Sequence, residues 1–132
     1  MIIIAASAAI SGCATFSQSG RNLSAGPNLP AAEGTVWFNA TRNDNVDINV
    51  RVKHLAHPEK LTPPSSTYVI WTRRNKDAAP QNIGELVVDS DLTGVLRTET
   101  PLHSFDLFIT AEASGQVQKP AGEPLLWTSY SR

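Results

Sequence analysis

The sequence has few of the residues that build disulfides, thiolate clusters and membrane spans. A single cysteine stands among its 132 residues, so no disulfide can form within the chain and no cluster of thiolates can bind a metal. Basic residues are not in excess, since the chain has 11 Lys and Arg and 12 Asp and Glu. This balance argues against a nucleic-acid partner. The longest apolar run, residues 2–10, is far shorter than the roughly 20 residues that cross a bilayer as a helix.

Sequence motifs of common enzyme classes are missing as well. The chain contains neither the G-x-S-x-G elbow of hydrolases nor the H-E-x-x-H motif of zinc proteases. No pair of carboxylates stands out for acid–base catalysis. We therefore expect a protein that is not an enzyme and that uses no cofactor.

What is present indicates one globular domain. Hydrophobic residues make up 41% of the chain and charged residues 17%, and three Trp, four Phe and two Tyr supply volume for a core. A domain of this size can bury such a core without help from disulfides.

The lone cysteine ends a short motif directly after the apolar run. Residues 2–10 have the length of the hydrophobic region of a secretory signal peptide. Ile10, Ser11, Gly12 and Cys13 then resemble the bacterial lipobox, which has a branched aliphatic residue, a small residue, Gly or Ala, and Cys. The resemblance implies cleavage between Gly12 and Cys13 and a diacylglyceryl group on the Cys13 thiol.

Two alternatives to this interpretation stay open. No Lys or Arg precedes Cys13, although signal peptides begin with a positive region, so the true start lies upstream or the signal is weak. A buried apolar N-terminus with an ordinary core cysteine is the second alternative. We expect the lipid-anchored form, because the polar residues that follow Cys13 are poor core material.

The lipid implies a location and a partner. Two or three acyl chains on Cys13 would hold the protein stably in a membrane, whereas one chain holds only marginally. Ala14 stands where this signal class usually carries Asp to retain proteins at the inner membrane. The expected location is therefore the cell envelope, at an outer membrane facing the periplasm or the exterior, with membrane lipid as a partner and an envelope protein as a second.

The composition divides the chain into three segments. Residues 1–12 form the expected signal peptide. Residues 13–33 comprise the lipidated cysteine and a stretch rich in Ser, Gly, Asn, Pro and Ala with little periodicity, which predicts a flexible linker. Residues 34–132 form the expected folded domain.

Alternation of apolar and polar residues predicts strands throughout this domain. It is clearest in residues 46–52, and in residues 105–112 it places Phe105 and Leu107 on one face and Asp106 and Phe108 on the other. Residues 67–72 are apolar on both faces and predict a central strand. The seven expected strands are residues 35–38, 46–52, 67–72, 83–89, 95–100, 105–112 and 125–130. With turn signals between them and no helix, they predict an all-β fold, a seven-stranded antiparallel immunoglobulin-like β-sandwich.

The second half of the chain carries a series of motifs in a definite order. They are Leu61-Thr62-Pro63-Pro64, Tyr68-Val69-Ile70-Trp71, Asn82-Ile83-Gly84-Glu85-Leu86, a turn ending at Gly94, the strand 105–112 and Pro120-Ala121-Gly122. In this order and spacing they resemble the extracytoplasmic C-terminal domain of anti-sigma-K factors. The resemblance implies a β-sandwich on the outer side of a membrane. It does not extend to sigma-factor binding, because the chain has a lipid signal in place of a transmembrane helix and no cytosolic segment.

Two groups of residues are candidate metal ligands. His54 and His57 form an H-x-x-H pair, and imidazoles bind zinc well; a solvated loop is the alternative. Asp89 and Asp91, with Gly94, resemble the start of a calcium loop. A hairpin turn explains the same residues, since Thr100 occupies the position of the bidentate Glu.

Two further groups are candidate binding residues. Arg73, Arg74 and Lys76 cluster in one turn and could meet an anionic partner or a lipid headgroup, or they form a solvated hairpin tip. The tryptophans, Trp37, Trp71 and Trp127, could stack on a sugar or peptide, or they belong to the core. We expect a non-enzymatic, membrane-anchored lipoprotein with an interaction or structural module. The alternatives are a ligand- or metal-binding module and a sensor-type domain.

Overall fold

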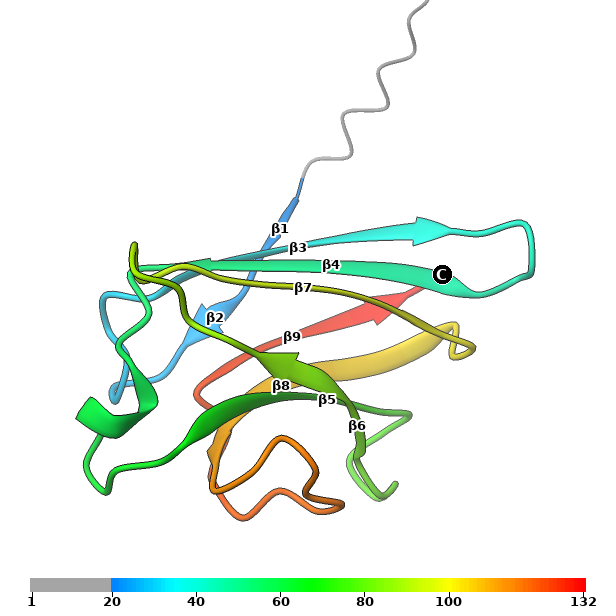
Figure 1. Ribbon diagram of the computed structural model, residues 1–132. Helices are drawn as coiled ribbons and strands as arrows, with labels where there is room; N and C mark the ends of the chain where they lie inside the picture. The colour runs from blue at the N-terminus through cyan, green and yellow to red at the C-terminus, as the bar shows by residue number, and fades with distance from the viewer. Residues whose placement is uncertain (1–19) are drawn as a thin grey trace, which may run out of the picture.

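The computed structural model describes residues 20–132 of the chain (Figure 1). Over this range it contains nine strands and one short 3₁₀-helix, η1, and no α-helix. The elements are β1 (Arg21–Asn22), β2 (Ser24–Ala25), β3 (Glu33–Ala40), β4 (Val46–Lys53), η1 (Pro58–Lys60), β5 (Thr67–Arg73), β6 (Gln81–Leu86), β7 (Gly94–Thr100), β8 (Ser104–Glu112) and β9 (Leu126–Ser131).

Three expectations fall on residues before this range. The signal peptide, its cleavage between Gly12 and Cys13 and the lipid on Cys13 lie outside the described residues. From residue 20 onward, the structure has no helix of the length and apolar character needed to cross a bilayer.

The strands form two antiparallel sheets. The first sheet has the order β1-β3-β4-β7, and the second has the order β2-β9-β8-β5-β6. Figure 1 shows the sheets as two facing layers, as in a β-sandwich. This arrangement confirms the predicted all-β class with antiparallel sheets. The seven expected strands correspond to β3 through β9, and β1 and β2 are additional.

β4 shows how the sequence pattern becomes structure. Val46, Ile48, Val50 and Val52 are at most 1% exposed, while the residues between them are half-buried or exposed. Alternate side chains of a strand point to opposite faces, and β-branched residues suit the pleated surface. β4 pairs along its length with β3 on one side and β7 on the other, so it lies at the centre of the first sheet.

The main core lies between the two sheets. Val36 and Ile48 from the first sheet belong to the same fully buried cluster as Ile70, Leu107 and Ile109 from the second. Burying one side chain of this size contributes roughly 1.5–3 kcal/mol. The core therefore supplies most of the force that holds the two sheets together.

The segment before β3 corrects the expected flexible linker. Leu23, Leu29 and Ala32 are buried, and the backbone N–H of Leu23 donates to the carbonyl of Gly34 at 2.9 Å. β1 pairs with β3 in the first sheet, and β2 pairs with β9 in the second. For residues 20–33 the linker prediction is therefore wrong. The segment, called here the N-terminal clasp (residues 20–33), crosses from one sheet to the other.

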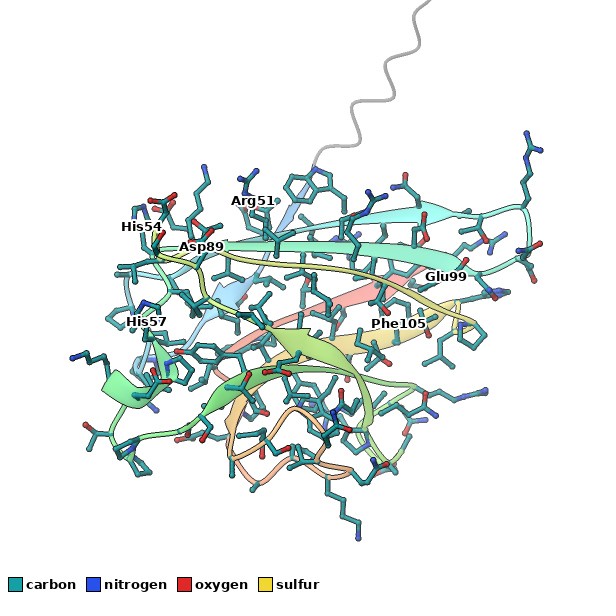
Figure 2. The ribbon with its side chains drawn as sticks, in the orientation of Figure 1. Arg51, His54, His57, Asp89, Glu99 and Phe105 are labelled. Carbon is teal, nitrogen blue, oxygen red and sulfur yellow. The ribbon has the colours of Figure 1, made fainter. Side chains whose placement is uncertain are left out.

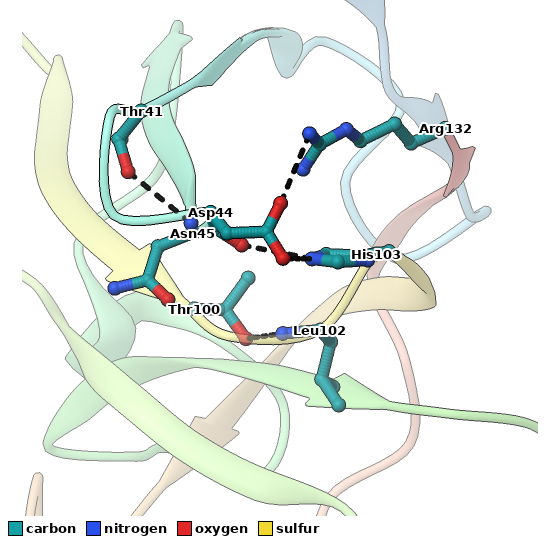
Figure 3. A network of polar contacts seen from close by, with 7 residues as sticks. All are labelled: Thr41, Asp44, Asn45, Thr100, Leu102, His103 and Arg132. Atoms are coloured by element: carbon teal, nitrogen blue, oxygen red, sulfur yellow. Dashed lines mark hydrogen bonds and ion pairs between the residues drawn. The ribbon is translucent and has the colours of Figure 1, made fainter.

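A network of polar contacts closes one end of the sandwich (Figure 3). Asp44 lies in the β3–β4 hairpin with φ of 64°, and its carboxylate contacts His103 Nε2 at 3.3 Å and Arg132 Nη2 at 3.1 Å. The backbone N–H of Arg132 donates to the His103 carbonyl at 3.0 Å. The contacts join the hairpin, the β7–β8 connection and the last residue of the chain.

Candidate binding groove on the second sheet

The outer face of the second sheet carries two adjacent rows of side chains. In the first row, Trp71 of β5, Phe108 of β8 and Trp127 of β9 stand directly opposite one another on neighbouring strands. Side chains at such positions contact each other across the sheet. The result is a continuous aromatic row across three strands, called here the aromatic row.

The second row lies two residues along each strand and is polar. Arg73, Asp106 and Ser129 stand opposite one another on β5, β8 and β9. Arg73 Nε donates to Asp106 Oδ2 at 3.3 Å, and the Ser129 hydroxyl donates to Asp106 Oδ1 at 2.8 Å. The guanidinium carbon of Arg73 also lies 5.1 Å from the centroid of the Phe108 ring. Arg73 therefore joins the polar row to the aromatic one.

The polar row, together with Phe108 and Trp127 of the aromatic row, forms the floor of a groove with a volume of about 450 Å³. This volume falls within the range of small-molecule sites in proteins. Trp127 is 42% exposed, whereas Phe108 is only 4% exposed. The lining residues are Arg73, Lys76, Asp106, Leu107, Phe108, Pro124, Trp127, Thr128 and Ser129. The groove thus offers an apolar aromatic side and a polar, charged side to the same ligand.

The connection between β8 and β9 covers the rest of this face. Val69, Trp71 and Phe108 form a second buried cluster, against which Val117 of the connection packs. The side-chain amide of Asn82 donates to the carbonyls of Gly115 at 2.9 Å and Val117 at 3.0 Å. The segment 113–124, called here the covering loop, therefore lies against the sheet and ends at Pro124 in the groove wall.

A buried carboxylate fixes the other half of the covering loop. Glu112 is 2% exposed and accepts the backbone N–H groups of Ala121 at 3.0 Å and Gly122 at 3.2 Å. The Thr110 hydroxyl donates to the same carboxylate, and the Trp71 indole N–H donates to that hydroxyl at 2.8 Å. Buried charge is costly without such partners. The chain of hydrogen bonds links the aromatic row to the covering loop.

The structure separates the predicted basic cluster. Arg73 and Lys76 line the groove. Arg74 does not; it lines a different hollow together with Leu102 and His103. Arg73 is the last residue of β5, whereas Arg74 lies just beyond the strand.

The predicted metal ligands come together only in part. His54 is exposed, with φ of 55°, in the connection after β4. The N–H of Leu55 donates to the carbonyl of Leu92 at 2.9 Å, so this connection lies beside the β6–β7 turn. Figure 2 shows His54 and Asp89 at the same end of the sandwich, with His57 below them.

The hairpin-turn alternative accounts for the aspartates. Asp89 Oδ1 accepts the backbone N–H groups of Asp91 and Thr93, both at 2.9 Å, which is a local turn interaction of Asp side chains. Within residues 20–132, no group of three or more His, Cys, Asp or Glu side chains could hold a metal ion. Neither the pair His54 and His57 nor the pair Asp89 and Asp91 therefore belongs to such a group.

Sequence reasoning did not single out three groove residues. They are Asp106, Phe108 and Ser129, and the alternation in residues 105–112 already places the first two on one face. What the sequence does not show is which strands are neighbours. Only the pairing of β8 with both β5 and β9 brings the basic and aromatic residues to these positions.

No protein-family model and no curated protein sequence matches the chain. Its function is therefore inferred from the groove and from the N-terminal motif.

Proposed function

We propose that the chain is a non-enzymatic, lipid-anchored module of the bacterial cell envelope that binds a ligand or an envelope partner through the groove on its second sheet. The motif ending at Cys13 supports the anchor. The single observation that carries the binding role is a concave site in which an exposed aromatic side chain, Trp127, stands beside a fixed polar row. Sites of this kind bind ligands by combining apolar contact with a few placed polar groups.

The position of Gly20 gives the module an orientation. A Cβ atom at Gly20 would meet the side chains of Thr35 and Trp37, so the first described residue lies at the first sheet. Figure 1 shows β1 on this side and the β8–β9 connection on the opposite side. The chain from Cys13 to Gly20 can span at most about 25 Å. An anchor at Cys13 would therefore hold the first sheet near the membrane and leave the groove facing away.

The strand order supports an immunoglobulin-like type of sandwich as part of this proposal. The longer strands follow the orders β3-β4-β7 and β9-β8-β5-β6. In an immunoglobulin-like scheme these correspond to strands A, B and E in one sheet and G, F, C and C′ in the other. Modules of this type commonly serve in recognition at the cell surface, which agrees with the proposed location. The resemblance to anti-sigma-K extracytoplasmic domains agrees with the same side of the membrane.

Metabolic labelling tests the anchor directly. We expect the full chain to incorporate radiolabelled palmitate and to sediment with membranes, because the acylated Cys13 supplies the hydrophobic attachment. Cys13→Ala should lose both the label and the membrane association. Ser17→Ala, which lies outside the four-residue motif, is the matched control and should keep both. A soluble, unlabelled parent chain would rule out the lipid-anchored role.

A further inference from the structure

We propose that the groove binds an acidic oligosaccharide built from uronic acids, with a sugar ring stacked on Trp127 and its carboxylate directed to Arg73 and Lys76. The inference rests on the proposed function, because it takes the same groove as the binding site. It adds the chemical class of the ligand.

The aromatic side of the groove fits one face of a pyranose ring. Trp127 is 42% exposed and lines the groove together with Phe108 and Pro124. An exposed indole gains stability when an apolar surface covers it. The face of a pyranose that carries its axial C–H groups is such a surface. The edge of the Trp127 indole lies beside Gly26 of the clasp, where an added Cβ atom would be 3.5 Å from Cζ3 of the ring.

The polar side fits the hydroxyl groups of the same ring. Each Asp106 oxygen accepts one hydrogen bond from a described residue, from Arg73 or from Ser129. A carboxylate oxygen can accept more than one. Among the described residues, Arg73 donates only through Nε, which leaves its terminal amino groups for a ligand. Planar carboxylate and guanidinium groups suit the neighbouring hydroxyls of a sugar because both can form paired hydrogen bonds.

The charge of the groove selects an acidic sugar. Arg73 and Lys76 provide two positive charges and Asp106 provides one negative charge among the lining residues. The excess of one positive charge complements a carboxylate on the ring. Arg73 pairs with Asp106 only through Nε, so its terminal amino groups are the ones that would meet the carboxylate of a ligand.

The backbone of the sheet argues against an extended peptide as the occupant. β5 and β8 each have a strand on both sides, and β2 covers β9 at Leu126 and Trp127, so at these positions the backbone hydrogen-bonding groups are used within the sheet. Peptides that bind to sheets add a strand at a free edge. The groove presents side chains on a sheet face, and this suits a sugar better.

Titration of the full chain, in detergent, with uronic acid tetrasaccharides tests the inference. The probes are the tetramers of galacturonate, glucuronate and mannuronate. Calorimetry and tryptophan fluorescence measure their binding. We expect saturable binding of at least one tetramer with a change in fluorescence. The methyl ester of that tetramer has the same rings without the charge and should bind about tenfold more weakly or worse, since loss of one charge-assisted contact corresponds to about that factor.

Matched variants assign the binding to the groove. Trp127→Ala and Arg73→Gln should each weaken binding by about tenfold or more. Trp37→Ala, on the first sheet, and Arg74→Gln, outside the groove, make the same chemical changes elsewhere and should leave binding unchanged. Lys76→Gln changes an exposed side chain and serves as the groove variant if either of the first two fails to fold.

The outcomes separate this inference from the proposed function. Equal binding of the acid and its ester would overturn the acidic specificity and leave the groove as a binding site. If no tetramer binds, the proposal that the ligand is an oligosaccharide is wrong. Palmitate labelling would still test the lipid-anchored module. Binding that survives the Trp127, Arg73 and Lys76 substitutions would overturn the groove in both roles.

Discussion

Arg73 illustrates how one side chain can serve two purposes at the groove. Its guanidinium lies over the Phe108 ring and bonds to Asp106. Both contacts depend on a planar, delocalised cation, which stacks on aromatic faces and forms directed hydrogen bonds. The same residue therefore fixes the aromatic and polar rows relative to each other before any ligand arrives.

A second side chain, Tyr68, gives a prediction about pH. Its hydroxyl donates to the Ala56 carbonyl at 2.6 Å, and burial, together with the nearby charge of Glu59, raises the pKa of Tyr68 to about 12. The folded state thus holds the phenol proton more tightly than the unfolded state, whose pKa is about 10. This contribution is complete below pH about 10 and is lost as the pH rises through about 12.

Urea unfolding between pH 8 and about 12 measures this effect, which we expect to be on the order of 2 kcal/mol. Tyr68→Phe is the control. It should lower stability at neutral pH by about 1 kcal/mol through loss of the hydrogen bond and should decline less in alkali than the parent. An identical alkaline decline in both proteins would show that Tyr68 is not responsible.

The tryptophans show what residue-level prediction could and could not achieve. Of the alternatives for them, core or ligand contact, the first is confirmed for Trp71, and the second stays a prediction for Trp127. Trp71 is fully buried, and Trp127 is 42% exposed in the groove. The two residues differ because the covering loop packs on one of them and leaves the other open. A loop position of this kind depends on tertiary contacts such as Asn82 to Gly115, which carry no local sequence signal.

At the scale of elements, the covering loop depends on Glu112. Within the described part of the chain, the loop has no neighbouring strand at this point to accept its backbone N–H groups. The Glu112 carboxylate accepts hydrogen bonds from the N–H groups of Ala121 and Gly122 and from the hydroxyl of Thr110. A hydrogen bond to a charged group contributes about 1.5–3 kcal/mol. Glu112 thus fastens the second half of the loop, while Asn82 binds its first half.

We expect Glu112→Ala to lower the free energy of unfolding by about 2–3 kcal/mol, because it leaves buried donors without an acceptor. Hydrogen exchange should also accelerate at Ala121 and Gly122 beyond the overall loss of stability. Global unfolding by urea and amide exchange by NMR provide the two measurements.

Glu123→Ala supplies the control, since this neighbouring carboxylate is exposed. It should change neither measurement appreciably. Unchanged exchange at Ala121 and Gly122 in Glu112→Ala would show that the covering loop is held by other contacts.

The strands themselves were the most predictable elements. Alternation located β4 and β8, and a run apolar on both faces located β5 as a central strand, because burial of a sheet face follows the period of two. β1 and β2 escaped prediction for a physical reason. Each has two residues, too few for any period, and β2 pairs with β9, near the other end of the sequence. The isolated Leu23 and Leu29 were the available signal, in a segment whose composition otherwise indicates a linker.

At the scale of the whole molecule, the N-terminal clasp joins the two sheets. Leu23 is 7% exposed and lies so close to Gly34 that a Cβ atom there would meet its side chain. Leu23→Ala should therefore lower the free energy of unfolding by about 2–3 kcal/mol, as expected for a buried Leu that leaves a cavity. Urea denaturation measures this loss.

Leu92→Ala offers a comparison with the same chemical change at a site that is 39% exposed. We expect it to cost well under half as much. A loss for Leu23→Ala as small as the one expected for Leu92→Ala would mean that the packing of Leu23 in the clasp adds little to the stability of the sandwich.

The clasp also has a mechanical consequence. If the chain is tethered through Cys13 and its groove holds an immobile polymer, tension runs from Gly20 into the fold. The tension can pass through β2 to the groove, because Ser24 of β2 pairs with Trp127 of β9. Each clasp strand pairs with its partner over only two residue pairs, whereas β4 forms eight residue pairs with β3 and seven with β7. Under such a load we expect the pairing of β1 and β2 to separate before that of β4, which would lengthen the tether and expose the core residues Leu23 and Leu29.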